Sequence, residues 1–172
     1  MIQKHILLSI LISILSFSVN AQKDVSSKST ETIKEFKEKS SKVAELFSSA
    51  YGYAVFPNIG KGGIGIGGAN GNGTVYRNGA VVGDCRMTQV SIGFQFGGQR
   101  YAEVIFFENE DSYHRFVEGN FEFAAQVSAV ALASGASADA KYRDGVLVFT
   151  QALGGLMYEA SVGGQKFKIK MR

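Results

Sequence analysis

Residues 166–172 are the part of the sequence whose types and spacing point most directly to chemistry. Lys and Arg alternate there with Phe, Ile and Met, so a β-strand would place the cations on one face and the apolar side chains on the other. Such a row can bind phosphates or lie on an anionic bilayer, where each Lys or Arg contributes ~1 kcal/mol. Lysines on an edge strand also prevent aggregation, which is an alternative role. The cations are Lys166, Lys168, Lys170 and Arg172, and Lys61, Arg77, Arg86 and Arg100 could extend their surface.

Few residues could carry catalysis. The chain has two histidines, one of them within the first 21 residues, which leaves His114. In a helix, the neighbouring Asp111 and Ser112 would not face its imidazole, so no Ser-His-Asp triad is expected. One histidine and the single Cys85 cannot form a zinc site without several carboxylates, and the sequence has no spaced cluster of ligands. We therefore expect a non-catalytic protein with no cofactor and no metal, although folding could still assemble a carboxylate pair.

Residues 61–73 contain seven glycines in thirteen positions and raise the question of nucleotide binding. A dinucleotide-binding loop leads into a helix, whereas a strand pattern follows here, and the Lys-Ser/Thr pair of a P-loop is absent. In residues 63–67 Gly and Ile alternate, which predicts a strand with isoleucines on one face and bare backbone on the other. We interpret the glycines as positions where a helix or a second sheet approaches the backbone closely.

From residue 53 onwards the sequence predicts mainly short strands separated by turns. Pro57 is expected to end the first strand, and a short helix is expected at residues 111–118, after acidic residues that suit the helix dipole. Residues 121–135 favour a strand, with a helix as the alternative because alanine is abundant. Turns are expected at the Gly-containing pairs in residues 70–73, 78–79, 97–98, 144–145 and 154–155.

Residues 30–50 have the pattern of an amphipathic helix of about five turns. Gly52 and Pro57 prevent this helix from continuing. Its apolar stripe could pack onto the sheet, or, with lysines beside it, could lie in the headgroup layer of a membrane. Nearby glutamates almost cancel the lysine charge, which favours packing. The candidate membrane contacts are Ile33, Lys34, Phe36 and Lys37.

Residues 1–21 have the layout of a secretory signal peptide: a basic start, an apolar run and small residues before the expected cleavage point. The apolar run is short for a membrane span, and an uncleaved N-terminal anchor is the alternative. We expect an exported protein, periplasmic or secreted, that associates peripherally with the envelope. Its single cysteine excludes an internal disulfide, and an unpaired cysteine in such a protein is usually buried. The net charge of +3 does not by itself indicate nucleic-acid binding, and we expect none.

Residues 50–76, AYGYAVFPNIGKGGIGIGGANGNGTVY, resemble the opening of the SYLF domain family. The shared features are an amphipathic helix, a strand ending in Phe-Pro and a glycine hairpin that begins Lys-Gly-Gly. Residues 90–107 and 158–167 also resemble the bacterial branch, so the resemblance covers most of residues 30–168. It implies a lipid-binding module. Eukaryotic members are associated with phosphoinositide membranes and, in some fungi, with actin.

In those members membrane contact is attributed to the N-terminal amphipathic segment. The resemblance carries this role over to Ile33, Lys34, Phe36, Lys37 and their helical neighbours. An exported chain would not meet cytosolic actin or phosphoinositides, so the ligand stays open.

The sequence as a whole predicts residues 22–172 as one SYLF-like, α+β domain. We expect a mainly antiparallel twisted sheet or partial β-barrel, covered by the N-terminal amphipathic helix and one short helix. The expected function is binding of anionic phospholipid headgroups or a membrane surface at the cell envelope. Two alternatives stay open: a structural protein that binds another envelope protein, and a carrier of a small apolar ligand inside the barrel.

Overall fold

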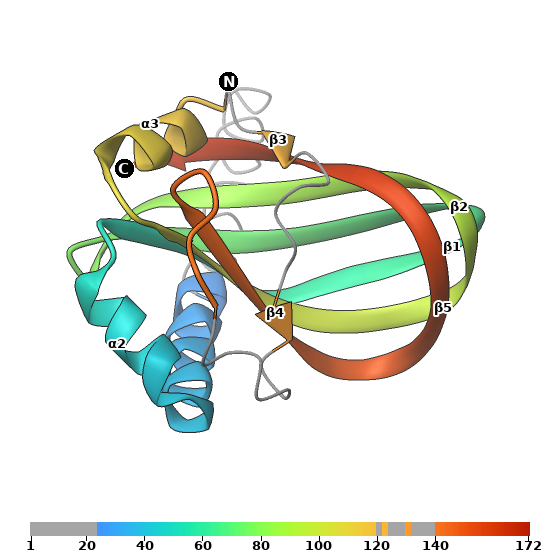
Figure 1. The fold of residues 1–172 in the computed structure, drawn as a ribbon, viewed down its shortest axis with the longest axis horizontal. Helices are drawn as coiled ribbons and strands as arrows, with labels where there is room; N and C mark the ends of the chain where they lie inside the picture. Colours follow the sequence, from blue (N-terminus) through green and yellow to red (C-terminus); the bar gives the residue numbers. More distant parts are fainter. Residues whose placement is uncertain (1–23, 120–121, 124–129, 132–139) are drawn as a thin grey trace, which may run out of the picture.

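Three long strands make up most of the sheet in the computed structural model, which describes residues 24–119, 122–123, 130–131 and 140–172 (Figure 1). They are β1 (Gly52–Arg77), β2 (Ala80–Phe107) and β5 (Val146–Met171). They pair as an antiparallel meander, to which β3 (Glu122–Phe123) adds antiparallel and β4 (Val130–Ala131) adds parallel, both along β5. The predicted fold class, α+β with a mainly antiparallel sheet, is confirmed.

Two of the predicted turns are confirmed. Asn78 and Gly79, with φ of 51° and 75°, connect β1 to β2. Asp144 and Gly145 have the same φ values and precede β5. Positive φ at both central positions suits Asn-Gly and Asp-Gly pairs. The short helix is also confirmed as α3 (Glu110–Val117), with acidic residues in its first turn.

The other predicted turns are wrong, because the strands continue through those glycines. Residues 70–73 lie inside β1, residues 97–98 inside β2 and residues 154–155 inside β5. Pro57 does not end a strand either, since it lies where the register between β1 and β2 shifts. Such a shift leaves residues unpaired, so a proline without an N–H is tolerated there.

Each long strand curves round at the right-hand end of Figure 1, so that its two halves lie in different layers. Within β1 the halves touch: a Cβ added at Gly71 would lie 2.6 Å from Ile59 Cγ1, and one at Gly73 would lie 2.6 Å from the Val55 carbonyl oxygen. The sequence predicted such a close approach to the glycine-rich segment. The approaching element is the other half of the same strand rather than a helix or a second sheet.

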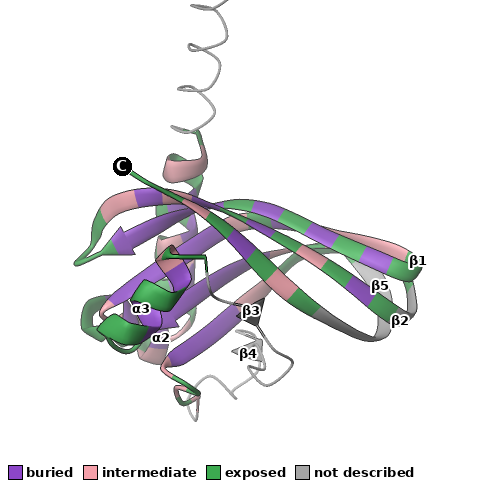
Figure 2. Ribbon diagram, turned by 90° about the horizontal axis from the view of Figure 1, so that it is seen from above, coloured by how far each residue is buried: buried purple, intermediate pink, exposed green. Residues whose placement is uncertain are grey.

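Two buried clusters hold these layers together. One lies between the strand halves, where for example the rings of Phe56 and Phe167 are 5.8 Å apart. The other lies under the N-terminal helices, where the rings of Phe47 and Phe106 are 4.8 Å apart. Neighbouring residues of β2 therefore face different clusters, and both faces of this part of the sheet are buried (Figure 2). This double burial explains the nearly continuous apolar runs of the sequence there.

The predicted single N-terminal helix is two helices. Residues 24–39 are helical, the chain breaks at Ser40, and α2 (Ser41–Ser49) follows. Ser40 has an extended backbone, with φ of −153°, and its hydroxyl accepts a hydrogen bond from the Val43 N–H, which makes it the N-cap of α2. The described helix also extends before residue 30, where the sequence pattern placed its start.

Some predictions concern residues that lie outside the described part. The proposed signal peptide, residues 1–21, is one of these, and most of residues 121–135 are another. Among the residues described, no helix combines the length and the apolar character needed to cross a membrane.

Candidate functional site

The outer face of β5 carries the predicted row of cations. Lys166, Lys168 and Lys170 are exposed, Phe167 is buried and Ile169 is partly buried, so the predicted alternation is confirmed over residues 166–170, whereas Met171 is exposed. The neighbouring strand adds a further cation, because Arg86 of β2 is exposed and pairs in register with Lys168. We call these four cations the basic face: Arg86, Lys166, Lys168 and Lys170.

Arg172 closes the row as part of an ion pair. Its guanidinium donates to both carboxylate oxygens of Asp84, at 2.8 Å and 3.2 Å. This hydrogen bonding raises the pKa of Arg172 and engages its charge within the protein. Of the predicted row, Arg172 anchors the end of β5 to β2. The three lysines are exposed, and Lys166 pairs in register with Glu122 of β3 on the other side of β5.

An open pocket of about 280 Å³ lies beside the basic face. Arg86, Lys168 and Lys170 contribute to its wall, and Val25, Cys85 and Ile169 give it an apolar part. The Cys85 thiol is buried, as predicted, and burial raises its pKa well above the usual value, so a reactive thiolate is disfavoured. Asp84, which is ion-paired with Arg172, also lines the pocket, so its mixed lining suits the apolar part of an amphiphile beside a charged group.

The helical candidates for membrane contact lie largely against the sheet. Phe36 is fully buried and Ile33 packs against the same cluster, so in this conformation neither apolar side chain is presented to a bilayer. Lys34 is exposed, 3.9 Å from Glu38. Lys37 lies 5.3 Å from the centre of the Phe47 ring. Of the two uses considered for the apolar stripe, packing onto the sheet is therefore the one that the structure shows.

Lys61 and the other predicted extensions lie at different places. Lys61 pairs in register with Gln99, whereas the residue of β1 opposite Arg86 is Asn72. Arg77 stacks on the ring of Tyr51, 4.7 Å from its centre. Among the four possible extensions, Arg86 is the one that pairs with the lysine row.

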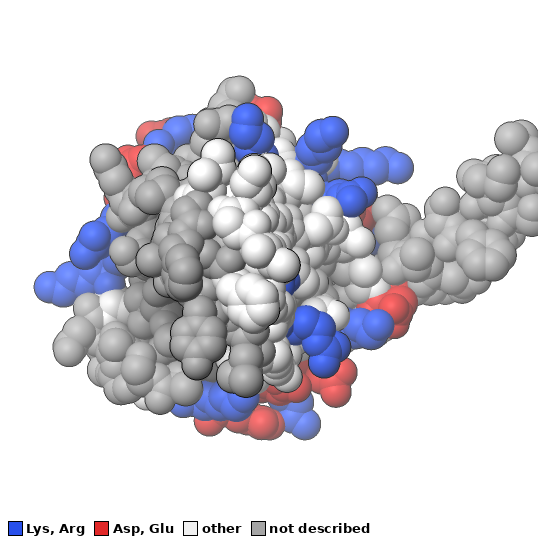
Figure 3. Space-filling view, turned by 90° about the vertical axis from the view of Figure 1, so that its right-hand side faces the viewer, with Lys and Arg blue, Asp and Glu red and all other residues white. Residues whose placement is uncertain are grey.

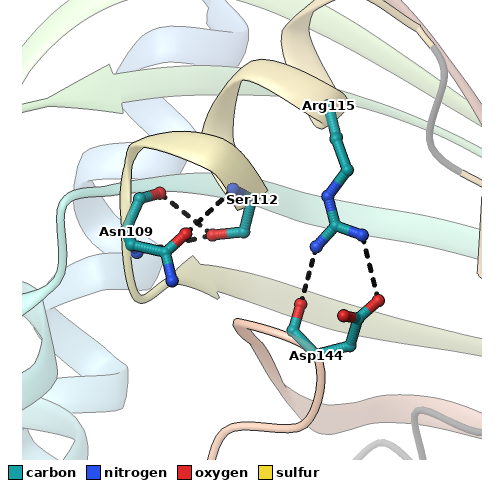
Figure 4. A network of polar contacts seen from close by, with 4 residues as sticks. All are labelled: Asn109, Ser112, Arg115 and Asp144. Atoms are coloured by element: carbon teal, nitrogen blue, oxygen red, sulfur yellow. Dashed lines mark hydrogen bonds and ion pairs between the residues drawn. The ribbon is translucent and has the colours of Figure 1, made fainter.

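The residues considered for catalysis have structural roles. Asn109 Oδ1 accepts a hydrogen bond from the Ser112 N–H, and the Ser112 hydroxyl donates to the Asn109 carbonyl, both at 3.0 Å (Figure 4). This caps α3. His114 is half-exposed, with Nε2 3.4 Å from Glu110 on the same helix. The residues in the described ranges contain no cluster of His, Cys, Asp and Glu that could hold a metal ion.

Sequence reasoning counted Glu103 among the carboxylates that folding could pair, but it missed that this side chain is buried. Glu103 is 1% exposed and lies in β2 among core residues. Gln165 Nε2 donates to its Oε2 at 3.2 Å, while its Oε1 has no hydrogen-bond partner among the described residues. Burial raises its pKa to about 7. The available signal was a glutamate between Ala102 and Val104 in residues 101–107, which are otherwise apolar.

Comparison with known proteins now identifies the domain. Residues 88–170 match the model of the Ysc84 family, which is described as "Las17-binding protein actin regulator". These residues form a Ysc84 (SYLF) domain. The SYLF resemblance is therefore confirmed. The matched range of the Ysc84 domain contains the three lysines of the basic face, and Arg86 lies just before it.

The chain is also similar to Beta cell expansion factor A from Aeromonas veronii, at 31% identity over 134 residues. The match covers 72% of this chain and 48% of the relative, so the chain spans about half the length of that curated protein. The glycine-rich residues 61–73 precede the range matched to the Ysc84 model. The descriptions of the family and of this relative suggest binding or regulatory proteins, and neither describes an enzyme.

Proposed function

We propose that this Ysc84-domain protein binds anionic phospholipid headgroups at a membrane surface and does so without catalysis. The observation that carries the proposal is the basic face. Arg86 and Lys168 lie directly opposite each other on neighbouring strands, with Lys166 and Lys170 on either side along β5. Like charges opposite each other destabilise a sheet, and an anion bound between them would remove this cost.

The spacing of these cations suits several phosphates at once. Side chains on one face of a strand repeat about every 7 Å, and paired strands are about 5 Å apart. A membrane presents many phosphates at comparable separations, and several weak contacts then add up. The alternation along β5 supports this use, since burial of Phe167 fixes the direction in which the lysines point.

We infer that binding takes place at the cell envelope, in the periplasm or outside the cell. The layout of residues 1–21 supports export. The family description names an actin regulator, but an exported chain would not meet cytosolic actin. The anionic surface available to it would be an envelope membrane.

Vesicle co-sedimentation tests the proposal with two matched variants. The first changes Lys166, Lys168 and Lys170 together to Gln, and we expect about a hundredfold weaker binding to phosphatidylglycerol-containing vesicles, from ~1 kcal/mol per lysine. The second makes the same charge change in the N-terminal helix, at Lys34, Lys37 and Lys39, and should bind nearly as well as the unmodified protein.

Three outcomes would contradict headgroup binding by the basic face. One is equal binding to phosphatidylcholine and phosphatidylglycerol vesicles. Another is an equal loss in both triple variants, which would show dependence on net charge alone. The third is unchanged binding with more aggregation in the β5 variant, which would assign the lysines to edge protection.

A further inference from the structure

The bent ends of the three long strands carry an exposed apolar surface. Its six side chains are between 40% and 78% exposed, and within the described part of the chain Met171 is the only other large apolar side chain exposed to this degree. We call this surface the apolar tip: Ile64, Ile66, Val90, Ile92, Phe96 and Leu153. Figure 3 views this end of the molecule and shows a pale central area of uncharged side chains.

The part of the tip on β1 and β2 is contiguous. Ile64 pairs in register with Phe96, and Ile66 pairs with Ile92. Paired residues on neighbouring strands have Cβ atoms roughly 5 Å apart, so these side chains adjoin each other. Monomeric soluble proteins seldom expose apolar side chains together in this way unless the patch binds something.

Glycine makes this display possible. A Cβ added at Gly63 would lie 2.4 Å from Gly67 Cα, and Gly65 between them has φ of 72°. Only glycine accepts the close contact at position 63 without a clash, and glycine also accepts the positive φ at position 65 without strain. The bend therefore requires the Gly-Ile-Gly-Ile-Gly alternation, and the isoleucines that it carries are left in solvent rather than in the core.

The charges around the tip indicate what it contacts. Each strand has a cation near its bend: Lys61 precedes Ile64, Arg100 follows Phe96, and Lys166 lies opposite Thr88, next to Val90 on the same strand face. Residues 58–83 and 85–102 contain no Asp or Glu. Glu159 is the acidic residue in the bent part of β5, and Glu122 of β3 pairs in register with Lys166. Figure 3 shows Lys and Arg side chains above, to the right of and below the pale centre, with Asp and Glu side chains farther out at the lower right and the bottom.

An apolar end with cations beside it on each long strand matches the profile of an anionic bilayer, whose phosphates lie just outside its hydrocarbon. The outer face of β2 follows the same order, from Arg86 through Thr88 to Val90 and Ile92. We propose that the apolar tip inserts into the hydrocarbon of an anionic membrane, while the basic face lies at the headgroups. Insertion rests on the membrane binding proposed above and adds a second, apolar contact surface to it.

Tryptophan fluorescence tests insertion directly, because the chain contains no Trp. A Phe96→Trp variant reports from the tip, and a Met171→Trp variant reports from an exposed site at the end of β5. With phosphatidylglycerol vesicles containing brominated acyl chains, we expect a blue shift and quenching for Phe96→Trp and neither change for Met171→Trp. Both variants should co-sediment with the vesicles.

Co-sedimentation of Phe96→Trp without quenching would overturn insertion and leave headgroup binding intact. Absence of co-sedimentation by the unmodified protein would overturn both proposals. Equal quenching of the two tryptophans would also contradict a specific role for the tip.

A second variant pair measures the contribution of the tip to affinity. Ile64→Ser with Ile66→Ser removes two side chains that are 78% and 67% exposed, so the fold should be kept, which circular dichroism would check. We expect vesicle binding about ten- to a hundredfold weaker, whereas Met171→Ser should bind like the unmodified protein. Unchanged binding would overturn insertion. If the unmodified protein is a dimer in the absence of vesicles and the double isoleucine variant is a monomer, the tip would instead be the contact with a second copy of the chain.

Discussion

At the residue scale, Glu103 is the group that conflicts most with its surroundings. Its side chain is 1% exposed, and one of its carboxylate oxygens has no partner within the described residues. A buried charge with a single hydrogen bond is costly, and protonation relieves the cost. For this reason burial raises the pKa of Glu103 from 4.5 to about 7, so the core of the sheet changes charge near neutral pH.

This shift predicts that the protein loses stability as the pH rises from about 4.5 to about 7. Below this window Glu103 is protonated in both the folded and the unfolded chain; above it, the folded state has lost about 3 kcal/mol relative to acidic conditions. Glu103→Gln should remove this pH-dependent loss and be the more stable protein at pH 8. Urea unfolding at several pH values measures this. Glu45→Gln, on the exposed surface of α2, is the control and should follow the unmodified protein.

At the scale of elements, Asn-Gly pairs have two structural roles, in a turn or within a strand, which the sequence pattern did not distinguish. Asn78-Gly79 is a turn with positive φ, whereas residues 70–73 continue a strand, although both contain Asn-Gly pairs. The difference depends on what lies opposite each glycine in the folded protein, and one strand pattern carries no information on that. The burial of both faces of β2 near Ile105 was visible as a continuous apolar run, but the fold of each strand back onto itself was not.

Because the two halves of β1 are in contact, Gly73 and Gly60 should differ in how well they tolerate a side chain. A Cβ at Gly73 would lie 2.6 Å from the Val55 carbonyl oxygen and 2.7 Å from the Phe56 ring, while one at Gly60 would meet nothing within 4 Å. We expect Gly73→Ala to lower the free energy of unfolding by about 1–3 kcal/mol through overpacking. Gly60→Ala should be neutral or slightly stabilising. Equal effects of the two substitutions in urea unfolding would show that the halves do not touch as described.

At the scale of the whole molecule, the sequence predicted the class of fold, the lysine row and the family, but not where the exposed apolar side chains would gather. Alternation in residues 166–172 is local, so it survives whatever the strand pairs with. The apolar tip arises because three segments distant in sequence bend at the same place, and only pairing shows that Ile64 meets Phe96. For the N-terminal helix the sequence favoured packing of its apolar stripe onto the sheet over membrane contact, and Phe36 is buried against the sheet.

These two routes to a membrane can be separated by locking the helix in place. Ser29 on the helix and Thr74 on β1 are both buried, and their hydroxyl oxygens are 3.1 Å apart. We expect Ser29→Cys with Thr74→Cys, made in a Cys85→Ala background, to form a disulfide that holds residues 24–39 on the sheet. If the basic face and the tip make the membrane contact, the oxidised protein should bind anionic vesicles as well as the reduced protein does.

Binding that disappears on oxidation and returns on reduction would show instead that the helix must leave the sheet. We expect no such effect, because releasing the helix from the sheet would cost free energy. Freeing residues 24–39 together with α2, which packs in the same cluster, would expose Phe36 of the first helix and Val43, Leu46 and Phe47 of α2, together with the apolar face of the sheet beneath them. Each of these large side chains contributes about 1.5–3 kcal/mol when buried, so a bilayer would have to replace the whole cluster before any gain. The tip needs no such opening, because its side chains are already exposed.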